Sequence, residues 1–289
     1  MMSASTTYTA ANPAADAVAA IVLAADRKVP DAVAVEAGTR CKALAPVAGV
    51  PMLHRVLQAL WQSGLIDRII LCGPPQDVVG GTPELQQLLV LPHVDWVACA
   101  TSPSASALNG FAAISPERIT LLTTADHALL SAQMVRFFLH QAQAGDWDLA
   151  VAVAEHRAVM ARFPGTRRTA IRLRGGPYCG CNLYAFLTPA ARRLAELWHR
   201  VEQDRKRPWR VIARLLGWRG VMSYLSGRLT LEQALQRLSR RLGVRIGAVV
   251  LPYPEAAVDV DTPADRHLAE AVLSEQGGAG ATISRGADG

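Results

Sequence analysis

The sequence has few charged residues, no apolar run long enough to span a membrane, and few aromatic side chains. Only 19% of its 289 residues are Asp, Glu, Lys or Arg and 51% are hydrophobic, which excludes a wholly disordered chain. A transmembrane helix needs about 20 consecutive apolar residues, and no run approaches that length. Residues 1–17 lack the charged start and apolar centre of a signal peptide, so we expect a cytoplasmic protein.

The five cysteines show no spacing that suggests a metal or redox site. The closest two, Cys179 and Cys181, are separated by one glycine, whereas zinc and redox pairs usually have two intervening residues. Free cysteine commonly behaves as a small core residue, so we expect buried or incidental thiols.

Positive charge is concentrated in the second half of the chain. The net charge is +6, and 20 of the 30 Lys and Arg residues lie between Arg157 and Arg245. A basic balance fits nucleic acid, anionic lipid or phosphorylated small molecules. Because the sequence has no recognised nucleic-acid motif and little aromatic interleaving, we expect no nucleic-acid partner.

Apolar runs typical of buried strands alternate with helical segments through the first half. The predicted strands are residues 21–23, 67–73, 94–100, 118–126 and 146–155. The predicted helices are residues 51–63, 83–91 and 131–141, and the Ser-rich segment 101–110 is predicted as a turn. Parallel strands require crossover connections, so this order predicts a doubly wound, mostly parallel α/β sheet with helices on both faces.

The second half is less regular but returns to the sheet. Its predicted elements are two strands around a Gly-Pro turn at 167–187, a helix at 188–204, a basic helical insertion at about 204–243 and a strand at 245–253. The closing helix is predicted to begin with Thr262 as its N-cap and Pro263 at its first position.

One domain is expected over residues 18–275, with the basic insertion before its last strand. The polar lead at 1–17 and the Gly-rich tail at 276–289 cannot pack a core, so both are predicted to be disordered. The stretch from Lys206 to Arg245 mixes apolar and arginine residues. It fits ordinary packing against the sheet, or peripheral association with an anionic membrane or a membrane transferase.

Four segments resemble one known family when they are taken in order. They are KALAPVAGVPML from Lys42, TTADHALLS from Thr123, GCNLY from Gly180 and DVDTPADR from Asp259. This set resembles the MobA-like NTP-transferase family of nucleotidyltransferases over about residues 18–275. The resemblance implies a Rossmann-like fold and transfer of a nucleoside monophosphate from an NTP to a phosphate or similar acceptor, with release of pyrophosphate.

Lys42 is the leading catalytic candidate. The resemblance implies that this lysine touches the phosphates, and an ammonium suits phosphate binding because it acts as a point charge. The alternative is a solvated surface lysine. Arg40, just before it, is the second candidate for a side-chain contact to the phosphates.

The metal candidates are aspartates at the ends of predicted strands. Asp126 matches the family's T-A-D segment and is expected to bind Mg²⁺ or Mn²⁺, since Mg²⁺ prefers one or two carboxylates plus substrate phosphates. Its alternative role is a helix N-cap. The second carboxylate is expected from Asp259 or Asp261, which point the same way on extended chain, and the sequence leaves the choice open.

The resemblance also implies binding residues for each substrate. For the nucleotide they are Leu23, Ala24, Ala25, Lys42, Ser104 and Ser106, and for the acceptor Asn182. Arg168 and Thr169, which precede the GCNLY segment, are further candidates for the acceptor phosphate, and Lys206 is a candidate second positive charge or part of a solvated face. The family loop that cradles the triphosphate is rich in glycine, whereas Asp26 stands here in place of the first glycine. That substitution puts a negative charge near a polyanion.

We expect a Mg²⁺-dependent nucleotidyltransferase that acts on an NTP and a small phosphorylated acceptor, such as a sugar or polyol phosphate. The narrower alternative is nucleotide transfer to the molybdenum cofactor. Because of Asp26, a catalytically weakened relative with a regulatory or membrane- or partner-binding role is a further alternative.

Overall fold

The computed structural model describes residues 18–26, 30–166, 168–203, 217–218 and 220–283. The predicted lead at 1–17 therefore lies outside the described residues, as does Lys206. In the part of the chain that the structure describes, no helix is both long and apolar enough to cross a membrane.

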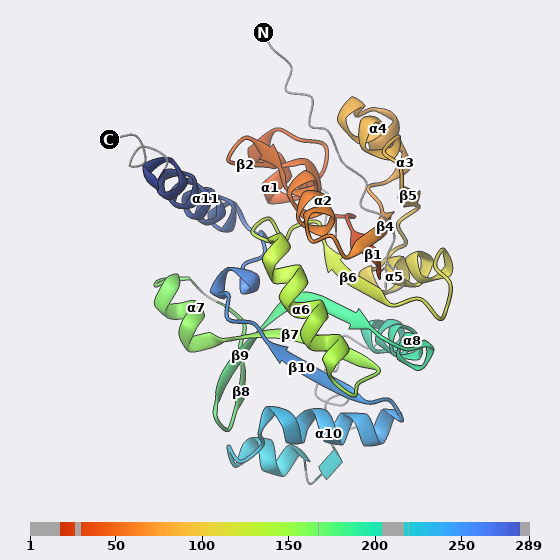
Figure 1. Ribbon diagram of the computed structural model, residues 1–289, viewed down its shortest axis with the longest axis vertical. Coiled ribbons are helices and arrows are strands. Elements are labelled where there is room, and N and C mark those ends of the chain that lie inside the picture. The colour runs from red at the N-terminus through yellow and green to blue at the C-terminus, as the bar shows by residue number, and fades with distance from the viewer. Residues whose placement is uncertain (1–17, 27–29, 167, 204–216, 219, 284–289) are drawn as a thin grey trace.

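The sheet is mixed but mostly parallel, as predicted. Its order is β10-β7-β9-β6-β1-β4-β5, with β8 paired to β9 (Figure 1). The strands are β1 Val18–Leu23, β4 Ile66–Cys72, β5 Val94–Val97, β6 Thr120–Thr124, β7 Leu149–Glu155, β8 Ile171–Leu173, β9 Gly176–Phe186 and β10 Ile246–Val250. Among the described strands, only β9 and its partner strand β8 introduce antiparallel pairs into this sheet, because β9 runs between β6 and β7 in the opposite direction.

Helices cover both faces of the sheet. They are α1 Ala32–Ala37, α2 Met52–Gln62, α3 Gln76–Gly80, α4 Pro83–Leu89, α5 Pro103–Ala112, α6 Ala132–Ala144, α7 His156–Arg162, α8 Pro189–Gln203, α10 Leu231–Leu242 and α11 Pro263–Ile283. Two 3₁₀ turns, η1 Lys42–Leu44 and η2 Pro254–Ala257, and a small hairpin, β2 Pro46–Val47 with β3 Val50–Pro51, complete the described elements. In Figure 1, α6 crosses in front of the sheet and α5 and α8 pack together at its right.

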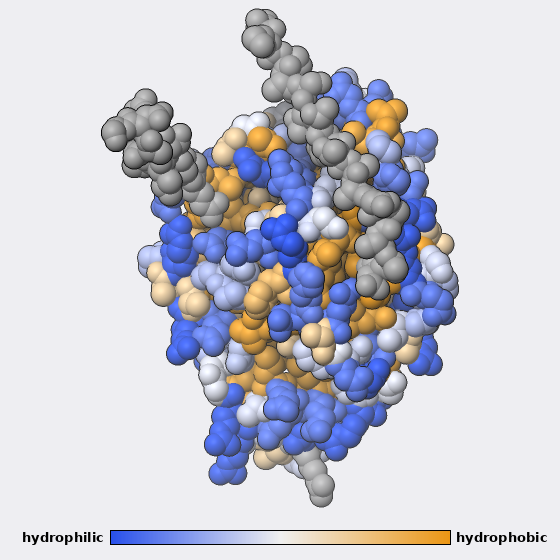
Figure 2. Space-filling model, in the orientation of Figure 1, coloured by the Kyte–Doolittle hydropathy of each residue, from blue (hydrophilic) through white to orange (hydrophobic). Residues whose placement is uncertain are grey.

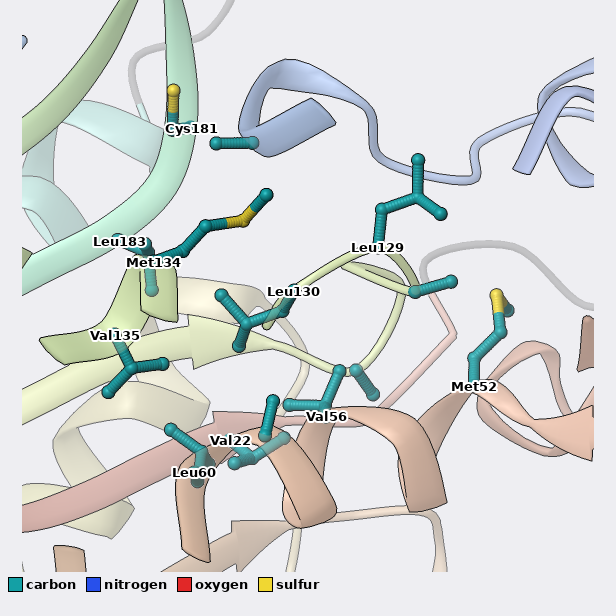
Figure 3. Packing of buried hydrophobic residues seen from close by; sticks show 14 of the residues in the cluster. Val22, Met52, Val56, Leu60, Leu129, Leu130, Met134, Val135, Cys181 and Leu183 are labelled. Atoms are coloured by element: carbon teal, nitrogen blue, oxygen red, sulfur yellow. The ribbon is translucent and has the colours of Figure 1, made fainter. Parts of the chain in front are cut away.

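Strand β1 is buried on both faces, which explains its unbroken apolar run. Ala20 and Val22 belong to the core cluster under α2 and α6, whereas Ala19 and Ile21 belong to the cluster under α5 and α8. Successive strand side chains point to opposite faces, so a strand covered on both sides has no polar position. Figure 3 shows Val22 packed among side chains of α2, the segment after β6 and the start of α6.

The prediction of a Ser-rich turn at 101–110 is wrong, because this segment forms α5. Ser102 caps the helix by accepting a hydrogen bond from the Ala105 amide, and Pro103 occupies the first turn. Buried Ala107 and Phe111 then pack on the sheet. Serine followed by proline is as typical of a helix start as of a turn, and the apolar spacing behind it identifies the helix.

The structure differs from the prediction at two other places. The long loop after β1 contains α1, which Asp31 caps by accepting from the Val33 and Ala34 amides. Helix α11 begins as predicted, since Thr262 and Asp265 exchange hydrogen bonds between side chains and backbone amides. It continues to Ile283, so the predicted domain end at residue 275 falls inside a helix.

The basic insertion contributes α10 directly before β10. Thr230 and Gln233 form a capping box at its start, and Gly243 ends it in the left-handed conformation. The surface over α10, at the bottom of Figure 2, is mostly hydrophilic. Trp218 and Leu225, from the preceding described segment, are exposed.

Asp148 ties three elements together at one end of the sheet. Its carboxylate accepts from the Arg245 amide at 2.8 Å, the Arg245 guanidinium and the Thr188 hydroxyl at 3.0 Å. We expect Asp148→Asn to lower the free energy of unfolding at pH 7 by about 1–3 kcal/mol, because the Arg245 amide loses a charged acceptor. Urea denaturation measures this loss.

The loss of unfolding free energy in Asp148→Asn depends on pH, because the pKa of Asp148 is lowered in the folded chain. Hydrogen bonds from Arg245 hold the pKa of Asp148 below its ordinary value, so its contribution is complete above about pH 4 and disappears as pH falls through the lowered pKa. Asp95→Asn, which removes a half-exposed partner of Arg68, is the matched control and should cost less than about 1 kcal/mol. Equal losses for both variants would contradict the prediction.

Candidate active site

A cavity of about 460 Å³ opens at the carboxyl ends of β1 and β6. Open α/β sheets bind ligands at this edge, where the direction of strand order reverses. The residues that line it include Leu23, Ala24, Ala25, Asp26, Lys42, Ala100, Thr101, Ser102, Pro103, Ser106, Asp126, Asn182, Tyr184, Trp198 and Asp261. The cavity therefore gathers residues from the whole length of the described chain.

Lys42 lies at the centre of the charged part of this cavity. Its ammonium donates to Oδ2 of Asp126 at 2.6 Å and to Oδ1 of Asp261 at 3.0 Å. Burial alone would lower the pKa of Lys42, but the two carboxylates raise it above the ordinary lysine value. The side chain is therefore a fixed cation at neutral pH, and the solvated surface lysine considered from sequence is wrong.

Hydrogen bonds to Asp26 fix the backbone of Lys42. The Lys42 amide donates to both carboxylate oxygens of Asp26 at 3.1 Å, which holds the start of η1 against the loop after β1. Burial is the largest cause that raises the pKa of Asp26 above its ordinary value. Asp26 thus accepts from a backbone amide in the loop where the family pattern has a glycine.

Asp126 lies two residues after the end of β6, and hydrogen bonds join this segment to the end of β1 and to the segment before α11. The Ala125 amide donates to the Leu23 carbonyl, and the Val260 amide donates to the Asp126 carbonyl at 3.0 Å. The second bond brings the segment with Asp259 and Asp261 to the end of β6. Burial alone would raise the pKa of Asp126, but the Lys42 ammonium lowers it below the ordinary value, so the carboxylate stays charged.

Asp259 points to different partners from Asp261. It accepts from the Arg168 guanidinium at 3.4 Å and from the Asn182 side-chain amide at 3.3 Å. Burial, with Asp261 and Asp126 nearby, raises the pKa of Asp259 above its ordinary value. Arg168 also binds Asp265 at 2.8 Å, so it holds the start of α11 against this segment.

The residues present fit a cation that takes only part of its ligands from protein. Among the described residues, no three His, Cys, Asp or Glu side chains are grouped so that they hold a metal by themselves. Asp126 and Asp261 nevertheless meet at one ammonium, and Oδ1 of Asp126 is buried with no hydrogen-bond partner in the described part. One or two carboxylates plus substrate phosphates are the usual protein environment of Mg²⁺.

The comparison with protein families matches this geometry to a known group. The family model of the MobA-like NTP transferase domain matches residues 20–226. The chain belongs to the MobA-like NTP transferase family. Its nucleotidyltransferase fold is also that of solved structures, whereas the comparison with curated proteins gives no match.

Three solved structures are similar to this fold. A hypothetical transferase from Thermus thermophilus has 34% identity and a TM-score of 0.70, covering 86% of this chain and 99% of its own. A 4-diphosphocytidyl-2C-methyl-D-erythritol synthase from Anaerococcus prevotii has 14% identity, a TM-score of 0.53 and coverage of 90% and 99%. A nucleotidyl transferase from Methanothermobacter thermautotrophicus has 18% identity and a TM-score of 0.50, and the match covers 90% of this chain and 99% of that protein's chain.

The residues predicted for the nucleotide are divided between the cavity and the core. Leu23, Ala24, Ala25 and Ser106 line the cavity, although the Ser106 hydroxyl accepts from the Ala100 amide. Ser104 is fully buried instead, and its hydroxyl donates to Glu202 on α8. Ser104 therefore joins two helices and does not line the cavity.

The other predicted residues lie at varying distances from the cavity. Asn182 lines it, with a positive φ of 47° in β9, whereas Arg168 is nearly buried in its pairs with aspartates. Thr169 is exposed, and Arg40 is exposed with its guanidinium beside Gly81. Neither is among the cavity-lining residues, so the phosphate contact predicted for Arg40 stays a prediction.

Sequence reasoning missed the two aromatic residues of the cavity. Tyr184 comes from β9 and Trp198 from the second half of α8. Tyr184 is the last residue of the GCNLY segment, so the family pattern could have identified it. Trp198 had no such signal, because an aromatic residue on an amphipathic helix more often packs into a core.

Proposed function

We propose that this chain transfers a nucleoside monophosphate from an NTP to a small phosphorylated acceptor, such as a sugar or polyol phosphate, with release of pyrophosphate. The observation that carries the proposal is the Lys42 ammonium, held between Asp126 and Asp261 in a cavity at the carboxyl edge of the sheet. Membership of the MobA-like NTP transferase family supports an NTP as one substrate.

In the proposed reaction an oxygen of the acceptor phosphate forms a bond to the α-phosphorus, and the bond from that phosphorus to the pyrophosphate oxygen breaks. Negative charge is spread over the phosphoryl oxygens in the transition state, so a fixed cation beside them stabilises it. Lys42 fits this role because it stays protonated and its backbone is anchored by Asp26. It donates hydrogen bonds and transfers no proton.

Asp126 and Asp261 are the residues that we propose to hold Mg²⁺ or Mn²⁺, together with phosphate oxygens. Such a cation, when bound, supplies charge neutralisation at the triphosphate and orients it. Asp259 has a different proposed role, because Arg168 and Asn182 already bind its carboxylate. It orients Asn182, the predicted acceptor residue that lines the cavity.

Pyrophosphate release tests this function directly. Each of the four ribonucleoside triphosphates is combined with a panel of phosphorylated sugars and polyols, with Mg²⁺ and with a molybdopterin acceptor for the narrower alternative. We expect one pair to give turnover, with kcat of about 1–10³ s⁻¹ as is typical of enzymes, and no release when the acceptor is omitted. A folded chain that releases no pyrophosphate with any pair would contradict the proposal.

The second candidate function, a catalytically weakened relative, is favoured by Asp26. Its carboxylate lines the cavity and takes the hydrogen bond of the Lys42 amide, in a loop whose backbone amides bind phosphates when glycines are present. The same assay, together with a measurement of NTP binding by calorimetry, separates the two candidates, since a weakened relative binds an NTP but gives little or no turnover with any acceptor.

A further inference from the structure

The cavity has a second part whose chemistry differs from that of the Lys42 region. The segment from Ala100 to Ser106 and helix α8 contribute these lining residues: Ala100, Thr101, Ser102, Pro103, Ser106 and Trp198. None of them is charged. Trp198 is 37% exposed, so part of its indole remains open to a ligand.

This part of the cavity is poorly suited to phosphate. The first amides of a helix commonly bind anions, but at the start of α5 the Ser104 amide donates to Glu202 at 3.1 Å and the Ala105 amide donates to Ser102. These donors are already used, and the carboxylate of Glu202 lies beside them. A phosphate placed here would meet a negative charge instead of free donors.

Polar contacts join α8, the helix that carries Trp198, to the start of α5. The buried Ser104 hydroxyl donates to Glu202 and lies 3.0 Å from Nδ1 of His199, the residue next to Trp198. Figure 1 shows the two helices packed together. These contacts hold the part of α8 that carries Trp198 against the start of α5, where Ser102 and Pro103 lie.

We propose that Trp198 stacks on the nucleobase of the NTP, while Lys42 binds its phosphates. This inference rests on the proposed function. An uncharged pocket with an exposed indole, continuous with a region that holds the Lys42 ammonium, matches a molecule that has a planar ring at one end and phosphates at the other. Stacking of a base on an aromatic side chain does not depend on base identity, so it adds affinity for every NTP.

Titration calorimetry of the full chain with Mg²⁺ and no acceptor tests the stacking. The variants are Trp198→Ala, Trp198→Phe and, as the matched control, Trp218→Ala, which removes an exposed tryptophan outside the cavity. The probes are the four NTPs and inorganic tripolyphosphate, which has the phosphates without the base. We expect Trp198→Ala to weaken the best NTP roughly tenfold and to leave tripolyphosphate affinity unchanged.

The other two variants give the remaining expectations. Trp198→Phe should keep most of the NTP affinity, and Trp218→Ala should bind like the wild type. Unchanged tripolyphosphate binding also reports that the Trp198→Ala variant is folded.

Three results would overturn the inference. Equal NTP affinity in the wild type and Trp198→Ala removes the stacking but leaves the proposed function intact. A raised KM for the acceptor with unchanged NTP affinity assigns the indole to the acceptor instead. Both proposals are contradicted if the wild-type chain binds every NTP no more tightly than it binds tripolyphosphate and also releases no pyrophosphate.

Discussion

Lys42→Ala is expected to lower kcat for pyrophosphate release by about 10²–10³-fold, the usual cost of removing one donor that stabilises transition-state charge. The ammonium is fixed between two carboxylates and is positively charged at neutral pH. The described residues that line the cavity include no other cation that could replace it. Steady-state kinetics with the best NTP and acceptor measure the loss. We expect a larger effect on kcat than on KM for the NTP.

Lys42→Arg separates charge from geometry. It keeps the positive charge, but a planar guanidinium does not reproduce the point contact of an ammonium 2.6 Å from Asp126, so we expect partial activity. Thermal unfolding is the control for structure, since breaking a buried ion pair costs about 3–5 kcal/mol and could unfold the alanine variant. A folded Lys42→Ala chain with wild-type kcat would remove Lys42 from the mechanism.

The part of the fold that could be predicted is the part where one periodicity dominates. Apolar runs such as residues 18–23 are buried on both sides, so they cannot be confused with surface helices. The prediction for residues 101–110 was wrong because the serine and proline that begin a helix are also common in turns. The choice depended on Ala107 and Phe111, which pack only once the sheet and α8 are in place.

The site was predictable where a strand end fixes the backbone. Lys42, Asp126 and Asp261 are far apart in sequence, yet the end of β6 and its bond to Val260 bring them together. Ser104 was assigned to the wrong surroundings because its partners on α8 are about 100 positions away. Local sequence patterns do not predict a contact between residues so far apart in the chain.

Asp126→Asn is expected to lower kcat by about 100-fold or more, because a neutral amide of the same shape neither attracts a divalent cation nor holds the Lys42 ammonium by charge. Its side chain is 14% exposed, whereas that of Asp261 is 55% exposed. Water therefore compensates for the loss of Asp261 more easily, and we expect Asp261→Asn to have the smaller effect. Activity measured against Mg²⁺ concentration should show a raised requirement in both variants.

The control for this comparison is Asp95→Asn, a half-exposed aspartate paired with Arg68 on the outer strands. It should leave kcat and the Mg²⁺ requirement unchanged. An Asp126→Asn chain that is folded, with a wild-type kcat and an unchanged Mg²⁺ requirement, would show that Asp126 only holds Lys42. A loss of kcat at an unchanged Mg²⁺ requirement would assign it that positioning role in catalysis and require the cation to be bound elsewhere.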